Sequence, residues 1–473
     1  WTLLMLAIAC SARLTLHQLE MMRINREMIG QASDDVEELT YNVPLDHFNV
    51  NVDEDFTIRY FVNAKYLSES DKSAPIFVLL GGEGPESPRV LQNNYVIDEL
   101  AKRNHGLMMS VEHRFYGGST PSLEMDHLKY CTAEQALMDY VEVINHVQEE
   151  RHLEGHPVVV LGGSYSGNLA AWMRQKYPNL VEAAWASSAP VEAVVDFYEY
   201  LEVVQRVLPK DTADLLGFAF ESWDAMTQTE EGRKKLQEIF RACTPFGEED
   251  IQTFAESIGT AMAGFVQYNS SSWSKNYESI DSIGNFIDED IVNNYPTFIK
   301  NNYEECTPSS KEAYYNDLKN TKTYLEGNTG AAGRSWFFQT CIAYGYYQAV
   351  DVHSFVKFGK LNKLQASIDM CKDIYGIENK TLYDAVEHTN VRYGSRKPCV
   401  TKVTFTNGDT DPWHALSVTD PKGQDGNLVQ LIHRTSHCSD LYRERATDIP
   451  ELKNARHKEM KFIEKVLKDL PTP

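Results

Sequence analysis

Short apolar runs that end in turns, with amphipathic patterns between them, recur through the first part of this chain. Residues 75–80 and 107–111 are nearly continuous apolar stretches that run into glycine-containing turns, and residues 157–161 repeat the pattern. Strands that are buried on both faces have this continuous apolar character. Between them, Thr132 and Gln135 form a capping-box pattern at the start of an amphipathic helix. The alternation predicts a mostly parallel sheet flanked by helices.

Length, composition and charge restrict the class of protein. The chain has 473 residues, of which 42% are hydrophobic, so there is ample material for a large core. Its 45 Lys and Arg residues against 68 Asp and Glu residues give a formal net charge of −23, which repels phosphate backbones and anionic lipid surfaces. We therefore expect neither nucleic acid nor a membrane as a partner.

The composition and the periodicity of the sequence change near residue 193, where Tyr, Phe, Glu and Asn become frequent and helical periodicity replaces the strand pattern. This change predicts a helical insertion, and the three glycines within residues 327–333 suit its exit. Strand patterns return at 402–406 and 428–432. The expected division is a signal-peptide remnant at 1–12, a sheet domain in two parts at 13–192 and 331–473, and a helical cap at 193–330.

The turn after the apolar run 157–161 carries the strongest chemical signal. Gly162, Gly163, Ser164, Tyr165, Ser166 and Gly167 follow the strand and lead into a helical pattern. A strand, a tight glycine turn and a helix form the nucleophile elbow, which raises a serine hydroxyl above the sheet edge. Ser166 occupies the position of the usual final glycine, and its hydroxyl is expected to bond a backbone carbonyl instead.

A serine nucleophile needs an imidazole to accept its proton and a carboxylate to orient that imidazole. In the α/β-hydrolase fold, the acid and then the histidine follow the serine in the sequence, on loops after late strands. Residues 402–406 lead to Asp409 and Asp411, and residues 428–432 lead to His433 and His437. The order predicts an α/β-hydrolase fold with an inserted helical cap domain, but spacing alone leaves open which aspartate and which histidine act.

Seven motifs occur in order along the chain: LDHFN at 45–49, GGEG at 81–84, EHRFYG at 112–117, EQAL at 134–137, GGSY at 162–165, SSAP at 187–190, and NG with DPW within 407–413. Together they resemble the family of post-proline serine peptidases that contains lysosomal Pro-Xaa carboxypeptidase, dipeptidyl peptidase II and thymus-specific serine protease, with the greatest similarity to the thymus-specific branch. They cover nearly the whole chain outside the middle of the cap.

The resemblance implies a catalytic triad of Ser164, Asp411 and His437. His433 then ends a strand, His113 is a structural histidine beside the site, and His414 caps a turn. The backbone N–H of Tyr165 and one from the loop at Gly81, Gly82 and Glu83 are the expected oxyanion-hole donors, with Gly82 and Glu83 as the candidates.

The expected substrate pocket has aromatic walls, because a proline ring is compact and apolar. The resemblance places Trp413 and Tyr346 there. It also implies that Thr-Glu should follow Cys341, whereas this chain has Ile342 and Ala343, so Glu83 is the remaining carboxylate for polar recognition. The alternative interpretation of Glu83 is a carboxylate that braces its loop.

The other cysteines and the sequons favour an oxidising compartment. Eight cysteines occur without metal-ligand spacing, so disulfides are preferred over a zinc site. The resemblance implies a Cys341–Cys371 disulfide, and Cys243–Cys306 is a second candidate pair across the cap. Glycosylation sequons begin at Asn269 and Asn379. With the signal-like residues 1–12, these features predict a secreted or lysosomal protein.

The sequence therefore predicts a serine-type exopeptidase that cleaves after proline near a peptide end, as a carboxypeptidase or a dipeptidyl peptidase. Peptides are the expected partners, a homodimer is left open, and neither a metal ion nor an organic cofactor is required. An esterase or lipase on the same scaffold is the first alternative, because fold does not decide substrate. The second is a secreted binding protein of hydrolase fold that has lost its activity.

Overall fold

The structure is a computed structural model that describes residues 35–92, 95–269, 280–285, 287, 290–302, 306–350 and 354–470. The described residues form a central eight-stranded sheet in the order β1-β2-β4-β3-β5-β6-β9-β10. β2 is antiparallel to both of its neighbours, and all the following pairs are parallel. The strands are β1 (Glu37–Pro44), β2 (Asp55–Asn63), β3 (Ile76–Leu80), β4 (Leu107–Val111), β5 (Val158–Gly163), β6 (Val181–Ser187), β9 (Val403–Gly408) and β10 (Leu428–Ile432).

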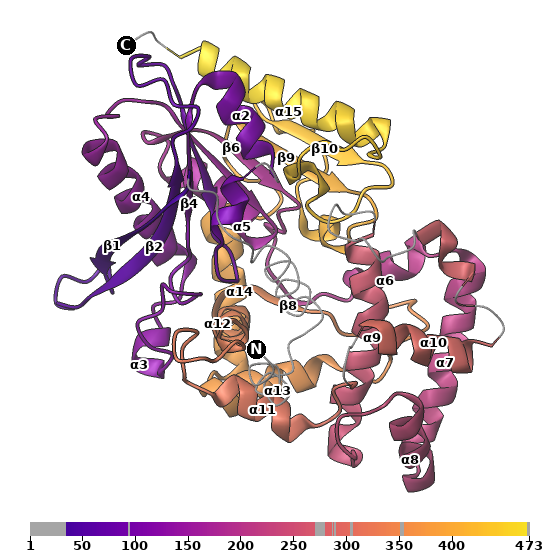
Figure 1. Ribbon diagram of the computed structural model, residues 1–473. Helices are drawn as coiled ribbons and strands as arrows, with labels where there is room; N and C mark the ends of the chain where they lie inside the picture. The colour runs from indigo at the N-terminus through magenta and orange to yellow at the C-terminus, as the bar shows by residue number, and fades with distance from the viewer. Residues whose placement is uncertain are drawn as a thin grey trace.

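Helices cover both faces of the sheet (Figure 1). α2 (Val96–Asn104) and α15 (Pro450–Lys468) pack on one face, and α4 (Ala133–Glu150) and α5 (Tyr165–Lys176) pack on the other. Every residue of β3 and β4 is buried, which explains their continuous apolar sequence. α4 begins where the Thr132 hydroxyl accepts a hydrogen bond from the backbone N–H of Gln135. The chain therefore has the α/β-hydrolase fold that its sequence predicts.

The chain between β6 and β9 is mostly helical and is seen beside and below the sheet in Figure 1; it contains the helical cap. Within it, β7 (Val194–Asp196) and β8 (Gly345–Tyr347) pair as a separate small sheet, and a disulfide joins Cys243 to Cys306. The helices are α6 (Glu199–Val207), α7 (Lys210–Thr227), α8 (Glu230–Ile239), α9 (Ile251–Gln267), α10 (Ile291–Asn302), α11 (Lys311–Lys319), α12 (Ala331–Gln339), α13 (Leu364–Tyr375) and α14 (Asn379–Tyr393), with a π-helical turn at Thr340–Tyr344. The proposed domain boundaries at 192 and 330 stay a prediction.

A buried ionic network fixes the amino-terminal motifs against the sheet. Arg114, which follows β4, donates from Nε to the Asp139 carboxylate at 2.6 Å, and both side chains are fully buried. Nε2 of His47 lies 2.7 Å from the other carboxylate oxygen of Asp139. The network joins three segments that are distant in the sequence, and it anchors the loop after β4. No helix in the described part of the chain is long and apolar enough to cross a membrane.

One buried carboxyl group makes the stability of this fold depend on pH. Glu459 of α15 is 0% exposed, and within the described residues neither of its carboxyl oxygens has a hydrogen-bond partner. Burial, with the neighbouring Asp440 carboxyl, raises the pKa of Glu459 well above its usual value. The contribution of this group to stability is therefore fully present below the pKa of an unfolded glutamate, and it is lost as the pH rises through the folded-state pKa.

We expect Glu459→Gln to raise the free energy of unfolding by roughly 1–3 kcal/mol at pH 8, because the amide has no ionisation for burial to oppose. The gain should shrink at pH 4, where Glu459 is already neutral. Urea denaturation at the two pH values measures both quantities, and Glu444→Gln at an exposed position is the matched control. Equal gains at pH 4 and pH 8 would contradict the assignment of the effect to this ionisation.

Candidate active site

Ser164 lies in a strained turn between β5 and α5. Its φ of 58° and ψ of −131° belong to a region that residues with side chains rarely occupy. The backbone holds this conformation from both sides: the Ser164 N–H donates to the Ser187 carbonyl at 3.0 Å, and its carbonyl accepts from the Gly167 N–H at 2.9 Å. The hydroxyl is thereby presented at the carboxyl edge of the sheet, where pockets meet.

The small residues around Ser164 allow α5 to approach β5. A Cβ atom at Gly162 would lie 2.0 Å from the Ser166 carbonyl oxygen, and one at Gly167 would lie 2.8 Å from the Ser187 carbonyl oxygen. Ser166 fits at the usual glycine position because its hydroxyl turns inward, where it donates to the Gly163 carbonyl and accepts from the Gly163 N–H, both at 2.9 Å. The replacement of glycine by serine is thus compatible with the elbow.

Two aspartate–histidine pairs occur at the adjacent ends of β9 and β10. Nδ1–H of His437 donates to Asp411 at 2.8 Å, and these side chains are 3% and 0% exposed. Nδ1 of His433 lies 2.6 Å from Asp409, but the His433 side chain is 75% exposed. Burial therefore distinguishes the two pairs that sequence spacing left equivalent, and His437 of the buried pair lines a pocket together with Ser164.

The surroundings of His437 stabilise its protonated form. Burial alone lowers the pKa of this imidazole, but the charge and the hydrogen bond of Asp411, with a contribution from Cys438, outweigh burial and raise the pKa well above its usual value. Nε2 of His437 is buried and has no hydrogen-bond partner within the described residues. In the neutral ring, Nδ1 carries the proton given to Asp411, so Nε2 is then available as a proton acceptor.

Ser164 lies where two pockets meet. We call the first the α9 pocket, because one face of α9 lines it together with Tyr346 and Trp413. The second, the His437 pocket, is lined by His437, Cys438, Glu86 and Tyr442. Ser164, Glu83 and Tyr268 border both pockets. A substrate bound across Ser164 would therefore occupy one pocket with each of its ends.

The other two histidines near Ser164 have structural partners. Nδ1–H of His113 donates to the Arg114 carbonyl at 2.6 Å, and its Nε2 accepts from the Tyr165 hydroxyl at 3.0 Å. Burial lowers the pKa of His113 to about 4, so the ring is neutral, as this arrangement requires. Nδ1 of His414 lies 2.5 Å from the Asp411 carbonyl and closes the turn after the acid.

The loop after β3 passes next to Ser164, and its backbone limits which groups face a substrate. The Gly81 N–H already donates to the Val111 carbonyl at 2.8 Å. Gly82 and Glu83 line the pockets, as does Tyr165, the first residue of α5. The N–H groups of Gly82, Glu83 and Tyr165 are therefore the candidates for an anion-binding site.

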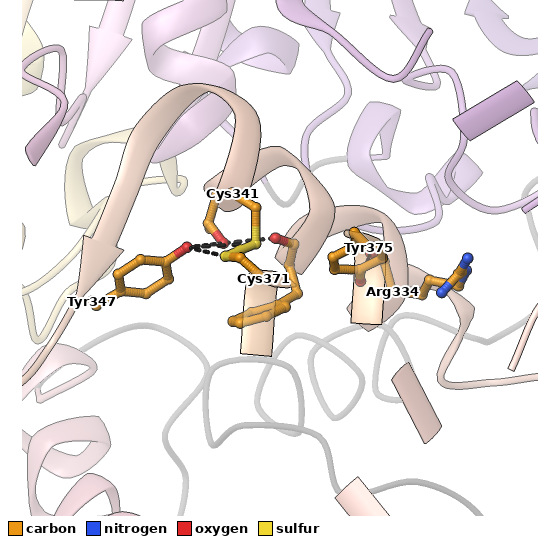
Figure 2. The surroundings of a disulfide bond; sticks show 7 residues. Arg334, Cys341, Tyr347, Cys371 and Tyr375 are labelled. Carbon is orange, nitrogen blue, oxygen red and sulfur yellow. Dashed lines mark hydrogen bonds between the residues drawn. A yellow bond between two sulfur atoms is a disulfide. The ribbon is translucent and has the colours of Figure 1, made fainter. Parts of the chain in front are cut away.

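Aromatic rings form the walls of the α9 pocket near Ser164. The rings of Tyr346 and Trp413 meet at 84°, with centroids 5.3 Å apart, and form a corner. Tyr347 continues this wall, and Figure 2 shows its hydroxyl directed at the sulfur atoms of the Cys341–Cys371 disulfide, with Cys371 Sγ at 2.9 Å. The disulfide thus supports the wall from behind.

Gln267, the last residue of α9, is a site residue that sequence reasoning missed. Its side-chain oxygen accepts from Trp413 Nε1 at 3.0 Å and from the Tyr200 hydroxyl at 2.6 Å. Its backbone carbonyl accepts from the His437 N–H at 2.9 Å. Gln267 belongs to no motif, so nothing in the sequence distinguishes it from the other polar residues of the cap.

Ile342 and Ala343 lie outside the α9 pocket. Both line a different surface pocket together with His388 and Arg392 of α14. In this structure a carboxylate at position 343 would therefore not face Ser164. Glu83, the alternative carboxylate, borders Ser164 and is 8% exposed.

The remaining sequence predictions have different outcomes. The Cys243–Cys306 and Cys341–Cys371 disulfides are present, and Cys131, Cys399 and Cys438 are free. Asn379 is exposed at the start of α14. Asn269 is 5% exposed and its side chain accepts from the Ile280 N–H, an environment that disfavours a glycan, so glycosylation at both sites stays a prediction. Residues 1–12 lie outside the described residues.

The strained serine after β5 and the buried aspartate–histidine pair after β9 and β10 define a serine hydrolase of the α/β-hydrolase fold. Comparison with protein families gives a narrower assignment. The model of the family described as "Serine carboxypeptidase S28" matches residues 43–459. The chain belongs to this family of serine peptidases.

Similarity to two human proteins agrees with this assignment. The human thymus-specific serine protease is 33% identical over 441 residues, which cover 87% of this chain and 83% of the relative. The human lysosomal Pro-X carboxypeptidase is 25% identical over 464 residues, covering 91% and 88%. Among solved structures, proline iminopeptidase of Mycobacterium smegmatis has a TM-score of 0.42 at 13% identity and covers 91% of this chain and 99% of its own.

The elbow predicts contrasting effects for two glycine-to-alanine substitutions. Gly162→Ala places a methyl group against the Ser166 carbonyl, so we expect it to abolish labelling of Ser164 by a fluorophosphonate and to destabilise the fold by roughly 1–3 kcal/mol. Gly259→Ala in α9 is the control, since no atom lies within 4 Å of its added Cβ. Normal labelling of the Gly162 variant would contradict the packing argument.

Proposed function

We propose that this serine peptidase uses Ser164, His437 and Asp411 as its catalytic triad. The observation that carries the proposal is the buried 2.8 Å hydrogen bond between His437 and Asp411, beside a serine in elbow geometry. Asp411 fixes the tautomer in which Nε2 of His437 accepts a proton, and it stabilises the imidazolium that results.

The proposed reaction is acyl transfer in two halves. The Ser164 oxygen attacks the substrate carbonyl carbon while Nε2 of His437 takes the hydroxyl proton. The tetrahedral intermediate then expels the amine, which receives this proton from His437, and Ser164 remains acylated. A water molecule, deprotonated by the same nitrogen, releases the acid and restores the serine.

The negative oxygen of the tetrahedral intermediate needs hydrogen-bond donors. We assign this role to the Tyr165 N–H together with an N–H from Gly82 or Glu83, since the Gly81 N–H is already bonded. Backbone donors of this kind are fixed before the reaction begins, and loss of one typically costs about 2.7–4 kcal/mol of barrier.

We further propose cleavage after proline. The perpendicular rings of Tyr346 and Trp413 form a compact apolar corner next to Ser164, which suits a proline ring and excludes a charged side chain. The relative named lysosomal Pro-X carboxypeptidase acts, according to its name, on bonds that follow proline. We propose that this chain works in lysosomes or outside the cell, and the relative's name supports the first of these locations.

Active-site labelling and kinetics test the triad. A fluorophosphonate should label the wild-type chain at Ser164 and should not label Ser164→Ala. Asp411→Asn should lower kcat by about four orders of magnitude, because the histidine loses its orienting carboxylate. Asp409→Asn, in the exposed pair, is the matched control and should keep most of the activity. A larger loss in the Asp409 variant than in the Asp411 variant would reverse our assignment.

A peptide panel tests the specificity. We expect cleavage after proline to exceed cleavage after alanine, leucine or lysine by at least tenfold in kcat/KM, with Trp413→Ala reducing this preference. Mass spectrometry of the products identifies the bond. Hydrolysis of acyl esters without any peptide cleavage would exclude the proposed specificity.

A further inference from the structure

The two pockets at Ser164 differ in which part of a substrate they can hold. In the reaction proposed above, His437 delivers a proton to the leaving amine, so the leaving group must lie on the side of Ser164 that His437 lines. His437 lines the His437 pocket and not the α9 pocket. The α9 pocket therefore receives the acyl part of the substrate, which runs from the scissile carbonyl toward the amino terminus.

The α9 pocket follows its helix away from Ser164. Its wall includes Glu256, Thr260, Gly264 and Gln267, which share one face of α9 at helical spacing. Gln267 marks the end next to Trp413, and Glu256 marks the opposite end. Eleven residue steps of helix separate them, or about 16 Å at the helical rise, which corresponds to an extended peptide of roughly four to five residues.

Glu256 brings a carboxyl group to the far end of this pocket, and it is negatively charged above about pH 7. Burial alone raises the pKa of the Glu256 carboxyl group to about 7. Among the described residues that line the α9 pocket, none is lysine, arginine or histidine. The carboxylate therefore faces a cavity without a compensating cation, and Tyr314 of α11, which lines the same cavity, interacts with it electrostatically.

The His437 pocket is also poorly suited to a carboxylate, because His437, the one basic side chain in its described lining, is needed for proton transfer. Its described lining contains the carboxyl groups of Glu83 and Glu86 but no lysine or arginine. A carboxypeptidase must accept the negative terminus of its substrate on the leaving-group side. The charges on both sides of Ser164 thus favour one binding direction, in which the positively charged amino terminus of the peptide lies in the α9 pocket.

We propose that Glu256 binds the α-ammonium group of the substrate, so that the chain releases short amino-terminal segments of roughly four to five residues. The proposal rests on the triad and the assignment of the two pockets given above. It makes Glu256 a specificity-determining residue for the length and the free amino terminus of the acyl part. The polarity is opposite to that in the name of the lysosomal relative.

The test compares peptides with two to six residues before the proline bond, each with a free or an acetylated amino terminus. For the wild-type chain, kcat/KM should be greatest near four to five residues and should fall at least tenfold on acetylation. Glu256→Gln should lose this difference while it cleaves acetylated peptides as the wild type does. Glu238→Gln, at an exposed position on α8, should behave like the wild type.

A second arm separates an α-ammonium group from a lysine side chain as the cation. Acetylated peptides with lysine as the first residue should remain poor substrates. These peptides could instead be cleaved as efficiently as peptides with a free amino terminus, and only when Glu256 is present. In that case the cation is a side chain, and the amino-terminal assignment is wrong. Equal cleavage of free and acetylated peptides by the wild type would overturn the proposal entirely.

Binding measurements distinguish failure of this proposal from failure of the proposed function. Ser164→Ala should bind the free peptide at least tenfold more tightly than the acetylated peptide in calorimetry, and adding Glu256→Gln should remove the difference. If cleavage falls after residues other than proline, the post-proline specificity is wrong, and the ratio of free to acetylated peptide still decides the role of Glu256. Equal binding of both peptides to Ser164→Ala would refute that role whatever bond is cleaved.

Discussion

The left-handed backbone at Ser164 is the constraint on which the rest of the site depends. That conformation persists because α5 presses against β5 and β6, and this close approach is possible only where Cβ atoms are absent, as at Gly162 and Gly167. The same edge of the sheet then supplies the remaining groups. β9 pairs with β6 and β10 pairs with β9, so the loops that carry Asp411 and His437 end at this edge, although they lie more than 200 residues from Ser164 in the chain.

Local sequence patterns identify the parts of the fold that are buried on both faces. The apolar runs at 107–111 and 428–432 coincide with β4 and β10, and the glycine turn after β5 predicts the elbow. β1 and β2 were not predicted, because they carry exposed polar residues such as Glu37 and Asp55 at the antiparallel edge of the sheet. β6 was also missed: its apolar residues form a run too similar to a helical pattern, and only pairing with β5 and β9 identifies it as a strand.

The active site contains residues whose roles cannot be decided from their spacing in the sequence. The sequence offers two aspartates two residues apart and two histidines four residues apart, and both possible pairs form in the structure. Burial distinguishes them, since only the Asp411–His437 pair is removed from water, where a charge interaction is strongest. Gln267 and Glu256 could not be found from the sequence because the cap helices carry no motif, and the role of a polar residue there depends on which face meets the pocket.

The contact of Gln267 with the sheet domain links the position of the cap to the chemistry. The end of α9 accepts hydrogen bonds from the His437 backbone and from Trp413, so lifting α9 away would break both and leave the loop that carries the histidine without its support. Substrate entry by a large movement of α9 would therefore disrupt the active site while the substrate binds. Substrate entry through the openings of the two pockets, with α9 kept in place, leaves the catalytic groups assembled between turnovers.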